Sequence, residues 1–150
     1  MTADSEAATV RPARAADYPA VVGLLEAARL PTAGLSSSLG DFLVVEAGDS
    51  LLGAVGLEVY GGAALLRSAV VAPEKRGHGL GAVLLERVLE HARSRGVRDL
   101  YLLTTTAEGW FPRFGFARIG REAVPAALHA SAEFKGACPD SAVAMHASLG

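Results

Sequence analysis

The sequence predicts an α/β protein with one mixed, twisted sheet of about six or seven strands and helices on both faces. Short apolar runs of strand length alternate with turn residues along the chain. Two longer stretches carry apolar residues at helical spacing. A chain of 150 residues, half of them apolar, has the size of one domain that can bury a core. We therefore expect a single domain over residues 1–150, with residues 1–7 disordered.

The first half of the chain divides into strands and one helix. Asp17 can cap the helix, and the segment Leu30–Gly34 ends it. Leu35–Gly40 is a loop or short helix that could form part of a substrate entrance. Gly48–Ser50 is a turn between two strands. The expected elements, in order, are a strand Thr9–Ala13, a helix from Asp17 to about Arg29, a strand Asp41–Ala47 and a strand Leu51–Tyr60.

Gly61 and Gly62 predict a two-residue hairpin turn into a strand Ala63–Val71, since glycine accepts a positive φ at both turn positions. This register places Glu58 opposite Leu65 and Gly56 opposite Arg67. Alternation then defines two faces. The first holds Ala54, Gly56, Glu58, Tyr60, Leu65, Arg67, Ala69 and Val71; the second holds Val55, Leu57, Val59, Leu66 and Val70, with Ser68 as an exception. The second face is core, whereas small residues around three polar side chains indicate that the first is a cavity wall.

The second half continues with a long amphipathic helix, Leu80–Arg95, ended by Gly96. Its apolar positions are Leu80, Val83, Leu84, Val88 and Leu89. The remaining expected elements are a strand Asp99–Thr104, a short helix around Ala107–Phe111, a strand near Phe116–Ile119, a helix near Pro125–Ala132 and a last strand Ser141–Ser148.

A glycine-rich turn, Arg76-x-x-Gly79-x-Gly81, opens the long helix and predicts an anion site. Free backbone N–H groups and the positive end of the helix dipole point to one spot there, and an arginine adds a permanent charge. A nucleotide P-loop is excluded because no Gly-Lys-Ser/Thr occurs. Residues 77–82 match the dinucleotide pattern G-x-G-x-x-A, but the strand does not lead directly into them, and the next strand ends in Thr104-Thr105-Thr106 where that pattern expects an acidic residue. An ordinary helix entry is the remaining alternative.

With its flanks, this turn resembles the GNAT superfamily of N-acetyltransferases. The resemblance rests on Ala69-Val70-Val71-Ala72-Pro73, the turn itself, the helix after it and the ending Phe111-Pro112-Arg113-Phe114-Gly115-Phe116. It implies a GNAT-like acyl-CoA N-acyltransferase fold that binds acetyl-CoA as co-substrate. The turn (Arg76, Gly77, His78, Gly79, Leu80, Gly81) would hold the pyrophosphate. Ala69, Val70 and Val71 would pair with the pantetheine arm where their strand parts from Leu100–Thr104, and Thr104 and Phe111 would line the far side.

Acetyl transfer needs a base, donors for the oxyanion and an acid. The resemblance assigns oxyanion binding to the backbone of Val70 and Val71. Glu58 is the candidate base, directly or through water, because partial burial beside an apolar wall raises a carboxyl pKa. The family often has a tyrosine at the position of Phe111, so the thiolate would take its proton from solvent or from Tyr60. The alternative for Tyr60 is an exposed residue before a turn.

Arg67 could bind an anionic group of the substrate through two hydrogen bonds. The alternative is a structural ion pair between Arg67 and Glu58 across the hairpin. Thr105 is a candidate substrate contact, although strand propensity and capping of the next helix explain the threonines Thr104–Thr106 equally well.

Four further segments of the sequence resemble the acetyltransferase branch associated with arsenic-resistance operons. They are Gly56-Leu57-Glu58, Ala64–Ser68, Tyr101–Ala107 and Cys138-Pro139. This resemblance implies a small amine substrate, such as an amino-acid-like toxin or an organoarsenical. A non-catalytic acyl-CoA-binding or sensing module is the rival interpretation.

The composition of the chain argues against several classes of protein and partner. The net charge of −2 and the lack of a dense basic run argue against nucleic acid as a partner. No apolar run is long enough for a membrane span, and no signal peptide is evident. One cysteine and no Cys/His cluster argue against a disulfide or a metal. We expect a cytoplasmic, metal-free protein; the resemblance also implies a possible homodimer.

Overall fold

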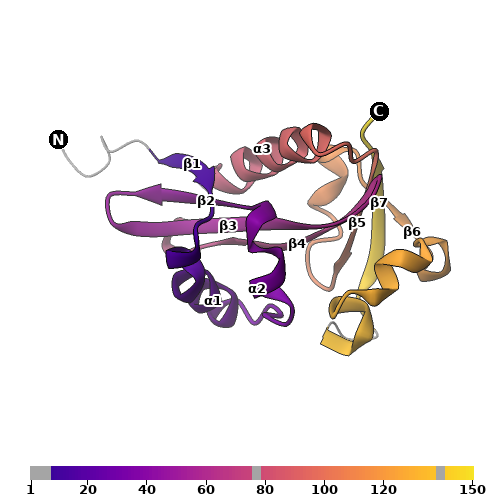
Figure 1. Ribbon diagram of the computed structural model, residues 1–150, viewed down its shortest axis with the longest axis horizontal. Helices are drawn as coiled ribbons and strands as arrows, with labels where there is room; N and C mark the ends of the chain where they lie inside the picture. Colours follow the sequence, from indigo (N-terminus) through magenta and orange to yellow (C-terminus); the bar gives the residue numbers. More distant parts are fainter. Residues whose placement is uncertain (1–7, 76–78, 138–140) are drawn as a thin grey trace.

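The computed structural model describes residues 8–75, 79–137 and 141–150. In these residues seven strands form one mixed sheet in the order β1-β2-β3-β4-β5-β7-β6 (Figure 1). The strands are β1 (Thr9–Pro12), β2 (Phe42–Ala47), β3 (Ser50–Tyr60), β4 (Ala63–Val71), β5 (Asp99–Thr104), β6 (Ala117–Ile119) and β7 (Val143–Ser148). The helices are α1 (Tyr18–Ala27), α2 (Leu35–Ser38) and α3 (Leu80–Ser94). The predicted fold class is confirmed; the disorder expected for residues 1–7 lies outside the described residues.

Helices cover both faces of the sheet, with α3 on one face and α1 and α2 on the other (Figure 1). Leu84, Leu85 and Val88 of α3 are buried in the larger core cluster. Val21 and Leu25 of α1 belong to the second cluster. The prediction for α3 was partly wrong. Its buried stripe includes Leu85, whereas Val83 is 42% exposed, since the stripe is centred closer to Leu85, Val88 and Ala92 than the sequence suggested.

The β3–β4 hairpin has the predicted register next to its turn. Glu58 pairs with Leu65 and Gly56 pairs with Arg67. Only Gly61 has a positive φ, of 69°, so the expectation of a positive φ at both turn positions was wrong.

Farther along β4 the prediction fails because of a β-bulge. Ser68 has a φ of 62°, and Ser68 and Ala69 together oppose the single residue Val55. The extra residue reverses the alternation, so Val70 pairs with Ala54 and packs in the cluster beneath α1. Ala69 and Val71 instead pack against the cluster beneath α3. They therefore do not share a face with Glu58 and Arg67, as the simple alternation had predicted.

Gly56 also has a different role from the expected one. A Cβ atom at this position would lie 2.0 Å from the Phe42 ring. The small residue therefore makes room for an aromatic ring that lies flat across the strand, and does not form a cavity wall.

Two irregular segments replace predicted helices. The chain turns at 108–110 and then forms a 3₁₀ helix, Phe111–Phe114, in place of a helix around Ala107–Phe111. The predicted helix near Pro125–Ala132 is a 3₁₀ helix, Ala126–Ala130, followed by a kinked helical turn, Glu133–Ala137. Other short 3₁₀ turns are Ala15–Asp17, Leu39–Asp41, Pro73–Lys75 and Arg121–Ala123.

Asp17 precedes α1, as predicted, but its side chain does not cap the helix. Its carboxylate accepts hydrogen bonds from the Arg11 guanidinium at 2.8 and 3.0 Å and from the Arg14 amide at 2.7 Å. The Arg11 bonds and partial burial act in opposite directions, and the bonds prevail: they lower the pKa of Asp17 to about 2. The residue thus joins β1 to the start of α1.

Candidate active site

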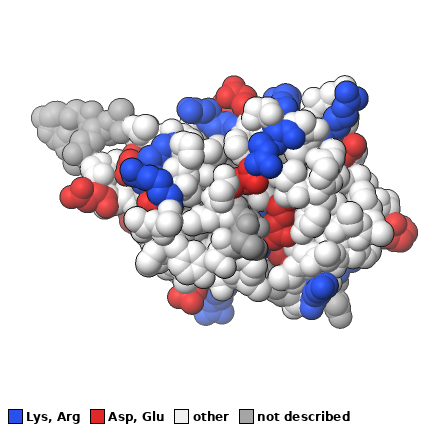
Figure 2. Space-filling model, viewed as in Figure 1, with Lys and Arg blue, Asp and Glu red and all other residues white. Residues whose placement is uncertain are grey.

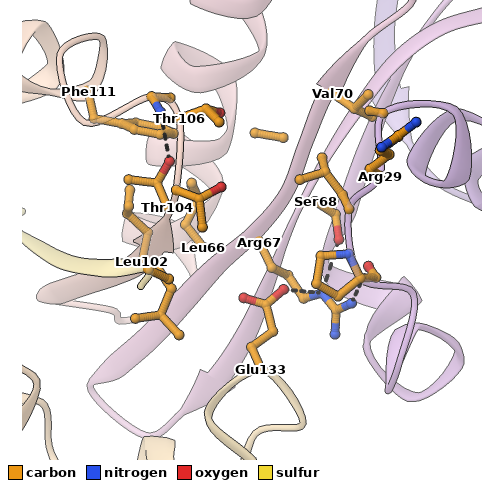
Figure 3. Close-up of a pocket in the computed structure, with 18 of the residues that line it drawn as sticks. Arg29, Leu66, Arg67, Ser68, Val70, Leu102, Thr104, Thr106, Phe111 and Glu133 are labelled. Carbon is orange, nitrogen blue, oxygen red and sulfur yellow. Dashed lines mark hydrogen bonds and ion pairs between the residues drawn. The ribbon is translucent and has the colours of Figure 1, made fainter. Parts of the chain in front are cut away.

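The candidate site is a cavity that opens where β4 and β5 part. The two parallel strands pair only from Ala63–Asp99 to Leu65–Tyr101. Beyond this point a cavity of about 680 Å³ separates them. Figure 3 shows one wall with Val70 and Ser68 of β4 and an opposite wall with Leu102 and Phe111. The predicted splay is confirmed, and it begins closer to the hairpin than expected.

Seven residues that were predicted to contact the cofactor or substrate line this cavity. They are Arg67, Ala69, Val70, Val71, Thr104, Thr105 and Phe111. Thr104 Oγ1 accepts a hydrogen bond of 3.0 Å from the Ala107 amide, so it caps the chain as considered, although a turn at 108–110 stands in place of the expected helix. Phe111 is buried and packs edge-on against Phe116. These lining positions are geometric findings, and the ligand contacts remain predictions.

The start of α3 lies beside the Val71 end of this cavity. Gly79 occupies the N-cap with a φ of 81°, a left-handed conformation that favours glycine, and no side chain caps the helix. A Cβ atom on Gly81 would lie 3.9 Å from Val71 Cγ2. The first-turn amides, including that of Leu80, thus begin next to β4.

The first three residues of the predicted anion turn, Arg76, Gly77 and His78, lie outside the described residues. Their proposed contacts stay predictions.

Arg67 is buried and surrounded by acceptors from the protein itself; its side chain has no exposed surface. Its Nη1 donates to Glu58 Oε2 and to the Ala33 carbonyl, both at 2.7 Å. Nη2 donates to the Pro31 carbonyl at 3.2 Å, and Nε donates to Ser68 Oγ at 3.0 Å. Arg67 therefore joins β3, the bulge of β4 and the segment between α1 and α2.

Glu133 is a site residue that sequence reasoning missed. It begins the kinked turn Glu133–Ala137, is 4% exposed and places Oε2 at 3.5 Å from Arg67 Nε. Figure 3 shows its carboxylate beside Arg67 in the larger cavity. A glutamate in an irregular segment has no periodic pattern around it. The one available signal was an acidic residue between the apolar residues Ala132 and Phe134.

Glu58 and Tyr60 line a second, smaller cavity of about 450 Å³. The Tyr60 hydroxyl donates to Glu58 Oε1 at 2.6 Å, while Oε2 faces Arg67. Both oxygens of the predicted base are thus engaged. Tyr60 is partly buried, so the alternative of an exposed residue before a turn was wrong.

Tyr60 should make stability depend on pH in the alkaline range. Burial, aided by the hydrogen bond to Glu58, raises the pKa of Tyr60 from 10.0 to about 12. A phenol with a raised pKa stabilises the fold fully below pH 10, and this contribution is lost as pH rises through about 12. We expect Tyr60→Phe to lower the free energy of unfolding by roughly 1–2 kcal/mol at pH 8, by loss of a hydrogen bond to a carboxylate. The difference should shrink toward pH 12, as measured by urea unfolding.

The exposed Tyr18 offers a matched control for this experiment. Tyr18→Phe should change neither the stability nor its pH dependence. A stability difference between Tyr60→Phe and the parent protein that stays constant from pH 8 to pH 12 would contradict the assignment.

The charges, metal-binding potential and helix lengths of the described residues give three further findings. On the face seen in Figure 2, basic and acidic side chains are interspersed. Within the described ranges there is no group of three or more His, Cys, Asp or Glu side chains that could hold a metal ion. None of the described helices has the length and apolar character needed to cross a membrane.

A splayed mixed sheet with a glycine-initiated helix beside the splay defines an acyltransferase fold of the GNAT type. The model of the family described as "Acetyltransferase (GNAT) domain" matches residues 38–118, which is more than half of the chain. The chain therefore belongs to the GNAT acetyltransferase family, and the superfamily resemblance is confirmed.

Individual relatives agree with this assignment. An amino-acid acetyltransferase of Azotobacter vinelandii is 35% identical over 95 residues, covering 62% of this chain and 22% of that protein. Among solved structures, N-acetylglutamate synthase from Neisseria gonorrhoeae, complexed with coenzyme A and N-acetyl-glutamate, matches 96% of this chain and 35% of that one, with a TM-score of 0.82 and 21% identity. A GNAT acetyltransferase from Staphylococcus aureus Mu50 matches 96% of this chain and all of that one, with a TM-score of 0.78 and 15% identity. The chain thus spans less than a quarter of the length of the curated relative.

Proposed function

We propose that this protein transfers the acetyl group of acetyl-CoA to the amine of a small, amino-acid-like molecule. The observation that carries the proposal is the cavity between β4 and β5, which opens because β4 pairs with β5 only as far as Leu65. A strand edge that faces a cavity can hydrogen-bond an extended amide-containing chain such as the pantetheine arm. The uncapped start of α3, next to Val71, would receive the pyrophosphate.

The chemistry requires a neutral amine. A carboxylate first takes a proton from the acceptor ammonium group. The amine nitrogen then forms a bond to the thioester carbonyl carbon, the C–S bond breaks, and the thiolate of coenzyme A leaves and is protonated. In this proposal a backbone N–H group at Val70 or Val71 stabilises the oxyanion. Phe111 offers no proton, and Tyr60 faces the other cavity, so the geometry favours solvent as the acid.

Two carboxylates could accept the proton. Glu58 is the one predicted from sequence, and water would have to connect it to the acceptor because Arg67 and Tyr60 engage its oxygens. Glu133 lines the larger cavity together with Ala69–Val71, so its position supports direct contact with the amine. We favour Glu133 as the proton acceptor and keep Glu58 as the alternative.

The amino-acid character of the acceptor is supported by the relatives, which include proteins described as amino-acid acetyltransferases. A toxic amino-acid analogue, such as an organoarsenical, is the finer possibility suggested by the resemblance to the arsenic-resistance branch. Both classes share an amine and an anionic group on one small skeleton.

The test is an acceptor screen. The protein is incubated with acetyl-CoA and a panel of small amines, including amino acids and organoarsenical amino acids, while free thiol is measured. We expect thiol release that depends on the amine, with an N-acetylated product by mass spectrometry. The rival function, a non-catalytic acyl-CoA-binding module, is motivated by Phe111 at the position where the family often has tyrosine. Calorimetric binding of coenzyme A without turnover of any amine would favour that rival.

A further inference from the structure

Arg29 has a backbone conformation that is unusual for its residue type. It has a φ of 60°, in the left-handed region. The Leu30 amide donates to the Leu25 carbonyl at 2.9 Å, and the Arg29 amide donates to the Glu26 carbonyl at 3.1 Å. These two bonds form a Schellman motif, in which the left-handed position is most often glycine. A side chain at this position costs backbone energy, so its presence calls for a reason.

The two non-glycine residues with a positive φ in the described ranges are Arg29 and Ser68, and both line the larger cavity. Figure 3 shows Arg29 beside Val70, on the wall formed by β4 and the end of α1. Ser68 produces the bulge that turns β4 into this wall. The two residues with a strained backbone therefore line the same cavity.

The guanidinium of Arg29 is exposed and free to bind a ligand. It forms neither a hydrogen bond nor an ion pair with any side chain in the described part of the chain. Arg67, by contrast, already donates to one carboxylate, one hydroxyl and two carbonyls. Of these two arginines at the cavity, Arg29 is thus the one with unused donors for an anion.

Another part of the cavity wall is acidic. Two carboxylates, Glu58 and Glu133, approach the single positive charge of Arg67, so this cluster carries an excess of one negative charge when both are ionised. Glu133 exposes this excess to the larger cavity. A cavity with a free cation at one wall and excess negative charge at another is complementary to a zwitterion.

We propose that Arg29 binds the anionic group of the acceptor and thereby makes the protein selective for anionic amines such as α-amino acids. The inference rests on the proposed acetyltransferase function and deepens it. The carboxylate of the amino acid accepts hydrogen bonds from the guanidinium fork, while the ammonium group points to Glu133. The sequence prediction had given this anion-binding role to Arg67.

The experiment compares L-methionine with L-methioninamide, which differ only in the carboxylate. Binding of each to the protein saturated with coenzyme A is measured by calorimetry, and the KM of each is measured by thiol release. We expect Arg29→Gly to weaken binding of methionine and raise its KM at least 10-fold, while the values for methioninamide change less than 2-fold. Because glycine suits the backbone at this position, the same variant should unfold at a higher temperature than the parent protein.

Arg87, on the exposed side of α3, provides the control. Arg87→Gly should leave both KM values unchanged. Equal effects of Arg29→Gly on methionine and methioninamide, or preferential binding of the amide by the parent protein, would overturn the assignment of Arg29. Binding of methionine through Arg29 without thiol release would instead support this inference and contradict the proposed acetyl transfer, so the two failures are distinguishable.

Discussion

Arg67→Leu is expected to lower the free energy of unfolding by about 3–5 kcal/mol, the usual cost of removing one partner from a buried ion pair. The side chain has no exposed surface and donates to Glu58, Ser68 and two carbonyl groups. Leucine fills part of the volume, but it leaves two buried carboxylates without their cation. Chemical denaturation at neutral pH measures the loss.

A second substitution tests the cause of this loss. Adding Glu58→Gln to Arg67→Leu removes one of the uncompensated charges, so the double variant should be more stable than Arg67→Leu alone. Arg67→Lys keeps the charge but cannot reproduce the bonds of the planar guanidinium, and it should fall between the parent protein and the leucine variant. An Arg67→Leu protein as stable as the parent would contradict the structural role of this residue.

The same variants separate the two interpretations of Arg67. If its role is structural, Arg67→Lys should change KM for methionine and for methioninamide by similar factors. A selective increase for methionine would restore Arg67 as the carboxylate-binding residue that the sequence suggested. The contacts in the structure support the first outcome.

Local rules make the hairpin predictable. Two adjacent glycines between strand-forming runs set the register, and that register alone brings Glu58 and Arg67 to one face of the sheet, within reach of each other. The bulge is not predictable in the same way. A serine at a positive φ has no compositional mark, and one extra residue in β4 is enough to reverse the faces of Ala69, Val70 and Val71.

The residues that complete the site come from segments without periodicity. Arg29 closes a helix at a position where sequence rules expect glycine, and Glu133 lies in a kinked turn far from the hairpin along the chain. Their contributions depend on tertiary packing: the segment after α1 and the turn Glu133–Ala137 both contact Arg67. The pair Glu58 and Arg67 can therefore be predicted from the sequence, whereas Arg29 and Glu133 cannot.

Glu133→Gln is expected to lower kcat/KM by about 100-fold or more, within the range for loss of a general base. Glutamine keeps the size of the side chain and an oxygen for Arg67, but it cannot accept a proton from the amine. Because the reacting amine must be neutral, the rates of both proteins should fall with decreasing pH, and the variant should lose only the additional fall that comes from protonation of the base. Measurement of kcat/KM from pH 5 to pH 9, with any accepted amine from the screen, gives the comparison.

Glu58→Gln is the matched variant, because Glu58 approaches the same arginine from the smaller cavity. It should keep the additional acidic fall in rate, with a smaller loss of kcat/KM, since its oxygens are engaged by Arg67 and Tyr60. The reverse result, with the additional acidic fall lost in Glu58→Gln and retained in Glu133→Gln, would assign the base to Glu58 through a bridging water. Thermal unfolding of both variants ensures that a slow rate is not the result of a smaller folded fraction. The roles of the two carboxylates that flank Arg67, each facing its own cavity, can thus be distinguished by comparing the pH profiles of kcat/KM of the two variants.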